Sequence, residues 1–261
     1  MQNKYVIYTC LTGGYDQLQQ PQAVNPEYDY ICFTDDFPQG RMGVWTIVPL
    51  PFKHKDKLVA SRYVKLLPHT VLSSYSCSVW MDANIIITGD LFYDYVNRCI
   101  NDEKVLIAQV DHVYQNRDCI YDEIEACLEA GKIGLWAALG QFFYLRRNHF
   151  PRHQGLFENN LIFRRHNDSF VKLISEVWWK EFNRHAKRDQ LSLNYIYWKE
   201  YYTPAQLLAP GECARNVDYL KYVNHAGQPQ VKGLRGKIRI KVSIPFSCMV
   251  YRLLTKPYRS K

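Results

Sequence analysis

The sequence lacks every phosphate-binding loop that can be recognised from glycine spacing alone. It contains neither Gly-x-Gly-x-x-Gly nor Gly-Lys-Ser/Thr, so Gly13-Gly14 matches neither a dinucleotide fingerprint nor a Walker loop. Its eight cysteines include no Cys-x-x-Cys pair, which excludes a zinc ribbon and a thioredoxin-type site. We expect these cysteines to be small reduced residues of the core.

Long apolar runs, internal repeats and low-complexity segments are also absent. No stretch approaches the roughly 20 apolar residues that span a bilayer, and a strand-like run begins at Tyr5, before a signal peptide would end. With 261 residues, of which 47% are hydrophobic, the chain is long enough for one large core. We expect a cytoplasmic protein, either free or peripheral on the cytosolic membrane face.

Acidic residues are missing from the last 30 positions. Residues 232–261 contain nine Lys or Arg and no Asp or Glu, whereas the first 231 residues contain 24 basic and 25 acidic residues. A neutral body argues against a nucleic-acid partner, which requires a basic face. We therefore expect a catalytic domain at 1–231 and a basic tail at 232–261 that meets an anionic surface.

The apolar periodicity predicts strands and helices that alternate along the chain. Strands are predicted at 5–12, 28–34, 79–81, 105–110 and 161–163, and helices at 56–67, at 120–130, after Asn167 or Asp168, and after Arg188. This alternation predicts an α/β fold whose mostly parallel sheet is covered by helices on both faces.

Polar side chains follow the predicted strands, where ligands of such sheets bind. These clusters are Gly13-Gly14-Tyr15-Asp16, Asp35-Asp36, Asp82-Ala83-Asn84 and Asp111-His112. Asp82 and Asn84 offer the oxygen ligands that a hard divalent cation needs when it also holds a diphosphate. Each feature also has a simpler interpretation, because Asp, Asn and Gly form turns and Asp189 is suited to cap a helix.

Eight motifs in register carry a family resemblance over residues 5–194. They are Tyr8 to Asp16, Phe33 to Asp35, Ser61 to His69, Trp80 to Asn84, Arg117 to Glu123, Glu158 to Asn160, Arg164 to Asp168, and Arg188 to Ser192. They resemble a glycosyltransferase family shared by bacterial polysaccharide-locus proteins and plant mucilage and cell-wall proteins. The segment from Trp80 to Leu91 is also similar to family 8 glycosyltransferases, which have the GT-A fold.

The resemblance implies transfer of a sugar from a nucleoside diphosphate donor, expected to be a UDP-sugar. Gly13, Gly14, Tyr15, Asp16 and Asp35 would hold the nucleoside, and Arg62 and Lys65 the diphosphate, although this pair also suits a solvated helix face. Asp82, Asn84 and His225 would bind Mn²⁺ or Mg²⁺. Asn84 departs from the carboxylate of family 8, and an amide is a weaker ligand for a hard cation.

The resemblance also implies a retaining reaction and an acceptor in capsule or lipopolysaccharide synthesis. Gln190 would lie near the anomeric carbon and Asp189 would orient the donor sugar; an inverting reaction would need a base, and Asp111, His112, Glu123 and Glu158 are the candidates. The glycan or lipid-linked acceptor is expected near Asp111, His112, Arg117, Glu123, Asn159 and Asn160. A non-catalytic sugar-binding module and a scaffold of an assembly complex are the alternatives.

The basic tail contains a candidate helix that starts at Pro245. Phe246, Met249, Val250, Leu253 and Leu254 fall at i, i+3, i+4, i+7 and i+8 and form an apolar stripe. Two interpretations are open at this point. The stripe either lies in a membrane interface or packs on the core of the protein itself.

Overall fold

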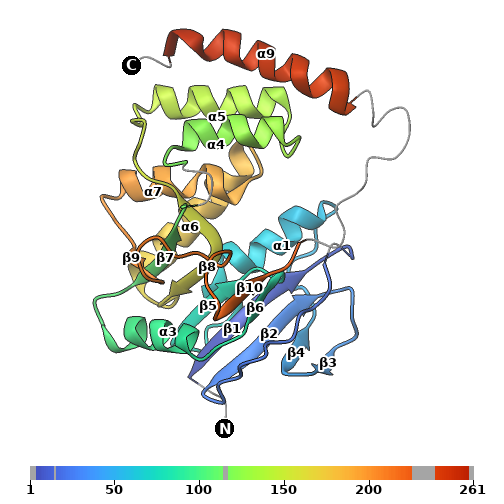
Figure 1. Ribbon diagram of the computed structural model, residues 1–261, viewed down its shortest axis with the longest axis vertical. Coiled ribbons are helices and arrows are strands. Elements are labelled where there is room, and N and C mark those ends of the chain that lie inside the picture. The colour runs from blue at the N-terminus through green and yellow to red at the C-terminus, as the bar shows by residue number, and fades with distance from the viewer. Residues whose placement is uncertain (1–3, 15, 114–116, 225–238, 259–261) are drawn as a thin grey trace. The chain divides into compact units, whose positions relative to one another are not determined.

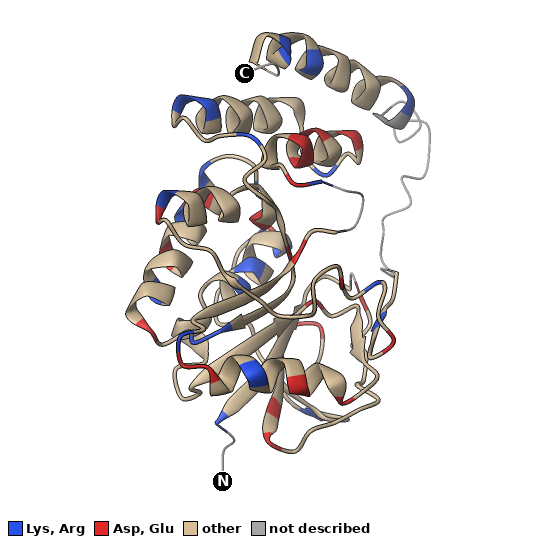
Figure 2. Cartoon of the chain, turned by 60° about the vertical axis from the view of Figure 1, so that its left-hand side comes forward, with Lys and Arg blue, Asp and Glu red and all other residues tan. Residues whose placement is uncertain are grey.

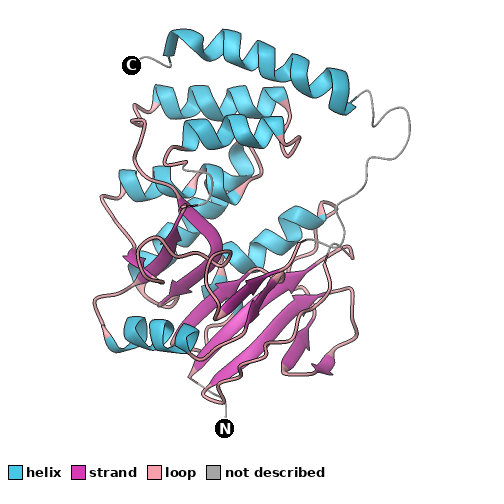
Figure 3. Cartoon of the chain, in the orientation of Figure 1, coloured by secondary structure: helices cyan, strands magenta, loops and turns pink. Residues whose placement is uncertain are grey.

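The computed structural model describes residues 4–14, 16–113, 117–224 and 239–258, which form two compact units. Unit 1 comprises residues 1–114, 157–179 and 203–228, and unit 2 comprises residues 115–156, 180–202 and 229–261. The described strands all lie in unit 1, whereas the described part of unit 2 is helical (Figure 3). The boundary at residue 231 that the charge distribution predicts stays a prediction.

Unit 1 is built on an eight-stranded sheet of order β3-β4-β2-β1-β5-β8-β7-β9 (Figure 1). The strands are β1 (Tyr5–Leu11), β2 (Tyr28–Thr34), β3 (Gly40–Met42), β4 (Trp45–Val48), β5 (Cys77–Met81), β7 (Ile107–Asp111), β8 (Phe157–Arg164) and β9 (Ala205–Gln206). Strands β4, β2, β1 and β5 pair in parallel, and β3 and β8 run antiparallel to their neighbours. The predicted α/β fold with a largely parallel sheet is confirmed.

Helices cover both faces of this sheet. Successive side chains of a strand point to opposite faces, so Ile7 and Val79, which are paired, face the helix α3 (Leu91–Asn101) and join its core residues. Tyr8 and Trp80 are the next pair and face α1 (Lys57–Leu66). The short helix α2 (Pro68–Val71) follows α1 directly.

Strand β8 is longer than the sequence predicted. It begins at Phe157 rather than at Leu161, so Glu158, Asn159 and Asn160 lie inside the strand instead of preceding it. All three side chains are buried, and each takes part in a side-chain hydrogen bond, which is how buried polar residues are accommodated in a strand. A smaller ladder pairs β6 (Ile85–Ile87) with β10 (Leu220–Tyr222) in antiparallel orientation.

Unit 2 contains the helices α4 (Ile120–Glu129), α5 (Leu135–Arg147), α7 (Leu193–Lys199) and α9 (Ile244–Thr255), with the shorter turns η2 (Asp189–Leu191), η3 (Arg239–Ser243) and η4 (Lys256–Tyr258). Helix α6 (Ser169–Arg184) begins in unit 1, where Asp168 Oδ1 accepts hydrogen bonds from Phe170 N and Val171 N. All eight cysteines are free thiols. No helix among the described residues is both long and apolar enough to cross a membrane.

A buried histidine in unit 1 makes stability depend on pH. His166 is fully buried, its Nε2 lies 2.8 Å from Leu72 O, and burial lowers its pKa to about 4. The unfolded chain therefore binds a proton between pH 6.5 and 4 that the folded chain does not. We expect the free energy of unfolding to fall by about 1.4 kcal/mol per pH unit from this residue as pH drops through that window.

Urea unfolding at several pH values measures this effect. The slope between pH 6.5 and 4 should become shallower in His166→Gln than in wild type. The dependence of the free energy of unfolding on pH is the readout, because a cavity or a lost hydrogen bond lowers stability equally at every pH and leaves this dependence unchanged. An identical slope in wild type and His166→Gln would contradict the assignment.

Candidate functional site

The carboxyl end of β5 delivers Asp82 into a tight corner. Asp82 N donates to Asn160 O of β8 at 2.9 Å, and Ile85 N donates to Asp82 O at 3.0 Å, so the chain turns directly into β6. β1, β2, β5 and β7 point in the same direction, as their pairings require. The described residues of the four polar clusters predicted after these strands therefore lie at one edge of the sheet.

Two donors converge on Oδ1 of Asp82. Trp80 Nε1 donates to it at 2.7 Å, and Lys65 Nζ lies 3.4 Å from the same oxygen and 5.1 Å from the centre of the Trp80 ring. The Lys65 side chain is 2% exposed, whereas that of Asp82 is 34% exposed. The carboxylate is thus fixed by the protein on one side and reaches solvent on the other, beside a buried positive charge.

Lys65 occupies its position because both ends of α1 are held. Asp56 caps the start by accepting a hydrogen bond from Leu58 N at 3.0 Å. At the end, Arg164 NH2 donates to Lys65 O at 2.7 Å and to the Tyr8 hydroxyl at 2.5 Å. A cation at the carboxyl end of a helix is favourable. Burial raises the pKa of Tyr8 to about 12 even though the Arg164 charge opposes this rise.

Asn84 is buried, and its Nδ2 donates to Val223 O at 2.9 Å, so the amide ties the corner to the segment after β10. His225 lies outside the described residues. A carboxylate and an amide oxygen are hard ligands, and magnesium sites commonly use one or two carboxylates together with substrate phosphates. Asp82 and Asn84 therefore fit a divalent cation whose other ligands come from a diphosphate.

The described residues also include a group of three side chains with the spacing of a metal site, Cys119, Asp122 and His153, in unit 2. Asp122 already pairs with Arg152 at 2.5 Å, and His153 with Asp118 at 2.8 Å. None of these three residues belongs to the predicted site, and we assign no metal there.

The glycine turn after β1 is held by Asp36. Gly13 and Gly14 have φ values of +70° and +62°, which favour glycine, and their N–H groups donate to the two carboxylate oxygens of Asp36 at 3.0 and 2.9 Å. Asp35 accepts from Leu50 N at 3.1 Å instead. Asp36 is thus the direct partner of the turn, a contact that sequence reasoning did not assign, and nucleoside contacts of Gly13, Gly14, Asp16 and Asp35 stay predictions. Tyr15 lies outside the described residues.

Arg62 and Lys65 differ in their surroundings although both lie on α1. Arg62 is partly exposed and donates from NH1 to Ser61 Oγ at 3.2 Å, whereas Lys65 is buried beside Asp82. The interpretation of both as a solvated helix face is therefore wrong for Lys65. Diphosphate contact by either residue stays a prediction.

Glu158 is buried, and both of its carboxylate oxygens are engaged by neighbouring side chains. Arg215 NH1 lies 3.0 and 2.9 Å from its two oxygens, and Asn160 Nδ2 donates to Oε2 at 2.6 Å. The Arg215 guanidinium also stands 4.2 Å from the centre of the Tyr222 ring. A carboxylate held in this way is suited to position Asn160, whose main-chain carbonyl accepts a hydrogen bond from Asp82 N. It is poorly suited to take a proton from an acceptor.

The remaining acceptor candidates of unit 1 also have partners. Asn159 Oδ1 accepts from Gln109 Nε2 at 3.0 Å, and Asp111 Oδ2 accepts from Gln206 Nε2 at 2.6 Å. His112 is half-buried and follows β7. Asp111 and His112 lie at the same sheet edge as Asp82, so they remain candidates for the acceptor side.

The other predicted residues belong to unit 2 and are described by themselves. Arg117 Nε pairs with Glu123 Oε2 at 2.7 Å, and the Cys127 thiol donates to Glu123 Oε1 at 3.5 Å. Both oxygens of Glu123 are thereby engaged. Asp189 is buried and Gln190 half-buried in the turn η2, so Asp189 is not the N-cap of α7, which is Ser192.

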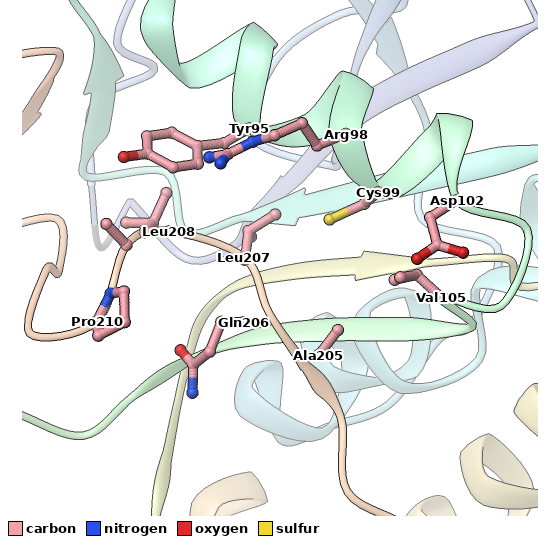
Figure 4. Close-up of a pocket in the computed structure, with 11 residues that line it drawn as sticks. Tyr95, Arg98, Cys99, Asp102, Val105, Ala205, Gln206, Leu207, Leu208 and Pro210 are labelled. Atoms are coloured by element: carbon pink, nitrogen blue, oxygen red, sulfur yellow. The ribbon is translucent and has the colours of Figure 1, made fainter.

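A surface pocket of about 330 Å³ exists elsewhere in unit 1 (Figure 4). It lies between α3 and the chain around β9, and its lining includes Tyr95, Arg98, Asp102, Leu207 and Leu208. None of the predicted site residues lines it. We therefore keep the candidate site at the Asp82 corner, where the strands end.

Three residues of the site were missed by sequence reasoning. Trp80 could have been found, because it lies two positions before Asp82 and side chains two apart share a face of a strand. Asp36 stood in a predicted cluster but was not chosen. Arg215 had no local signal, since 57 positions separate it from Glu158.

The family described as "TOD1/MUCI70, glycosyltransferase-like domain" matches residues 1–217, which is most of the chain. This match confirms the glycosyltransferase resemblance drawn from the motifs. The comparison with curated proteins gave no match.

Among solved structures, the chain is similar to the apo WbbM bifunctional glycosyltransferase, with a TM-score of 0.42, 12% identity, and coverage of 79% of this chain and 38% of the other. For the apo glycosyltransferase GlyE of Streptococcus pneumoniae the TM-score is 0.41 and the identity 12%, with coverage of 79% of this chain and 46% of the other. For the apo form of mouse xyloside xylosyltransferase 1 the TM-score is 0.39 and the identity 6%, with coverage of 76% of this chain and 80% of the other. The chain spans less than half the length of the first two proteins.

Proposed function

The chain belongs to the TOD1/MUCI70 family of glycosyltransferase-like domains, and on that premise we propose that it transfers a sugar from a nucleoside diphosphate donor to a glycan. A UDP-sugar is the donor we propose, and a glycan or lipid-linked acceptor of capsule or lipopolysaccharide synthesis is the second substrate. The reaction takes place in the cytoplasm.

The observation that supports this proposal is the Asp82 corner. An open carboxylate, fixed by Trp80 and accompanied by the buried Lys65 ammonium, follows a central strand of a largely parallel sheet. Ligands of such sheets bind beyond the carboxyl ends of the strands. The corner combines a ligand for a cation with a positive charge, and each can offset the negative charge of a sugar diphosphate.

In the proposed reaction the bond between the anomeric carbon and the diphosphate oxygen breaks, and the oxygen of the acceptor hydroxyl bonds the anomeric carbon in its place. The proton of that hydroxyl passes to the departing diphosphate in the retaining course, or to a base if the reaction inverts. Lys65 and Arg62 offset negative charge on the departing diphosphate. A divalent cation held by Asp82, Asn84 and His225 would offset the same charge.

We propose a retaining course in which Gln190 supports same-face attack by positioning and Asp189 orients the sugar. An amide is too weak a nucleophile to form a covalent adduct. If the reaction inverts, Asp111 or His112 is the better candidate base, because Glu158 and Glu123 are both held by arginines.

A panel of nucleotide sugars tests the proposal. With Mn²⁺ present, we expect slow hydrolysis of one donor, detected as release of its nucleoside diphosphate, and faster release when the true acceptor is added. Binding of a donor that is neither hydrolysed nor transferred, whichever acceptor is added, would favour the non-catalytic binding module instead. Absence of binding to every donor would favour a scaffold.

A further inference from the structure

Helix α9 is apolar on two sides, and the other described residues cover only one of them. Its buried residues are Cys248, Tyr251 and Thr255, at i, i+3 and i+7. Phe246, Met249 and Leu253 have the same spacing but are exposed. At about 100° per residue, the two sets lie on roughly opposite sides of the helix.

The covered side docks on α4 and α5 within unit 2. The Tyr251 ring packs edge-on against Phe142 of α5, with the ring centres 5.9 Å apart. Arg252 pairs with Glu129 and, at 2.5 Å, with Glu125, both on α4. The orientation of α9 is therefore fixed by packing and by charge, and Arg252 serves this docking.

The exposed side is the apolar stripe that the sequence predicted. Leu253 is 72% exposed, Phe246 59% and Met249 57%, and Leu254 on the same half of the helix is also exposed. Among the described residues of unit 2, these four side chains therefore do not pack on the core, which contradicts the second interpretation for this unit. Contiguous apolar residues of this kind mark an interaction surface.

The charges around the stripe are of one sign. Lys241 and Lys256 are exposed near the two ends of α9, and residues 239–258 contain no Asp or Glu. Figure 2 shows blue and no red along this helix. The stripe and its flanking cations require a partner that is apolar in its interior and anionic at its surface.

We infer that α9 is an interfacial helix that binds the chain to an anionic lipid surface, with Phe246, Met249 and Leu253 in the acyl region and Lys241 and Lys256 at the headgroups. A second copy of the chain would bring the same cations together across a two-fold interface, and nucleic acid offers no apolar interior. This inference is independent of the proposed catalytic activity.

Vesicle sedimentation with the full chain tests the inference. We expect binding to vesicles of phosphatidylglycerol and phosphatidylcholine that weakens at least tenfold between 50 and 500 mM salt, as roughly 1 kcal/mol per cation near the surface implies. Binding to phosphatidylcholine alone should be weaker. The triple change Phe246→Ser, Met249→Ser and Leu253→Ser should abolish binding without unfolding the chain, because all three side chains are exposed.

Matched variants separate the stripe from general surface effects. Leu173→Ser removes another exposed apolar residue, on α6, and should leave binding unchanged. Lys241→Gln with Lys256→Gln should weaken binding, whereas Lys104→Gln with Lys221→Gln, both exposed in unit 1, should not. Equal binding by the triple-Ser variant, or no binding by wild type, would overturn the inference. So would a wild-type dimer, seen by light scattering, that the triple-Ser variant loses.

Discussion

Asp82→Asn is expected to remove the metal-dependent part of nucleoside diphosphate binding and to lower donor turnover by at least about 10²-fold. The substitution keeps the size of the side chain and an oxygen that can accept from Trp80 Nε1, so it removes mainly the negative charge. Asp82 is the only residue of the Asp82-Ala83-Asn84 corner with a carboxylate, so the variant leaves the corner without a negative charge. No lysine-rich phosphate loop exists in the sequence to replace it.

Calorimetric titration of UDP and GDP, with and without Mn²⁺, measures the effect for wild type and Asp82→Asn. Asp90→Asn is the matched control, because it makes the same charge change at an exposed position eight residues further along. A urea midpoint near that of wild type excludes misfolding, which matters because Asp82 lies 3.4 Å from the buried Lys65 ammonium. Equal affinity with and without Mn²⁺ in both proteins would refute the metal hypothesis.

The strands and their ends were predictable because the signal is local. The strand predicted at 5–12 is β1 almost to the residue, and the one at 28–34 is β2, since each is an apolar run that ends at polar or glycine residues. The cap of α1 by Asp56 is local as well. The start of β8 was not predicted, because three consecutive polar residues, Glu158 to Asn160, are not typical of a buried strand. The partner that buries Asn159, Gln109, lies 50 positions away.

The partners of the site residues were not predictable, because they come from distant positions. Lys65 could be placed on α1 from periodicity, but its burial beside Asp82 depends on Arg164, which is 99 positions away and holds the Lys65 carbonyl. The pairing of Glu158 with Arg215 depends on how β8 meets the chain before β10. Asp35 and Asp36 are adjacent after β2 but have different partners: Asp35 accepts from Leu50 N and Asp36 accepts from Gly14 N. The backbone conformation after the strand determines which carboxylate meets which partner.

Gln190→Ala is expected to lower turnover by about 10²-fold while leaving nucleotide affinity nearly unchanged. The family resemblance assigns Gln190 to the sugar end of the donor, where an amide acts mainly in the transition state. Gln190 is half-buried, and the η2 turn that carries it is also held from α5, because Gln141 Nε2 donates to Leu191 O at 3.0 Å.

Turnover and nucleotide affinity must be measured separately for this test, with the donor and acceptor that the panel identifies. A lower kcat with an unchanged Kd for the nucleoside diphosphate places the effect in the chemical step, whereas a fall in both would indicate a role in holding the donor. Gln154→Ala, at an exposed position of the same unit, should behave as wild type. Near-normal transfer by Gln190→Ala would show that the catalytic role carried over from family 8 does not apply to this chain, and the search for the group that supports departure of the diphosphate would then return to Lys65 beside Asp82.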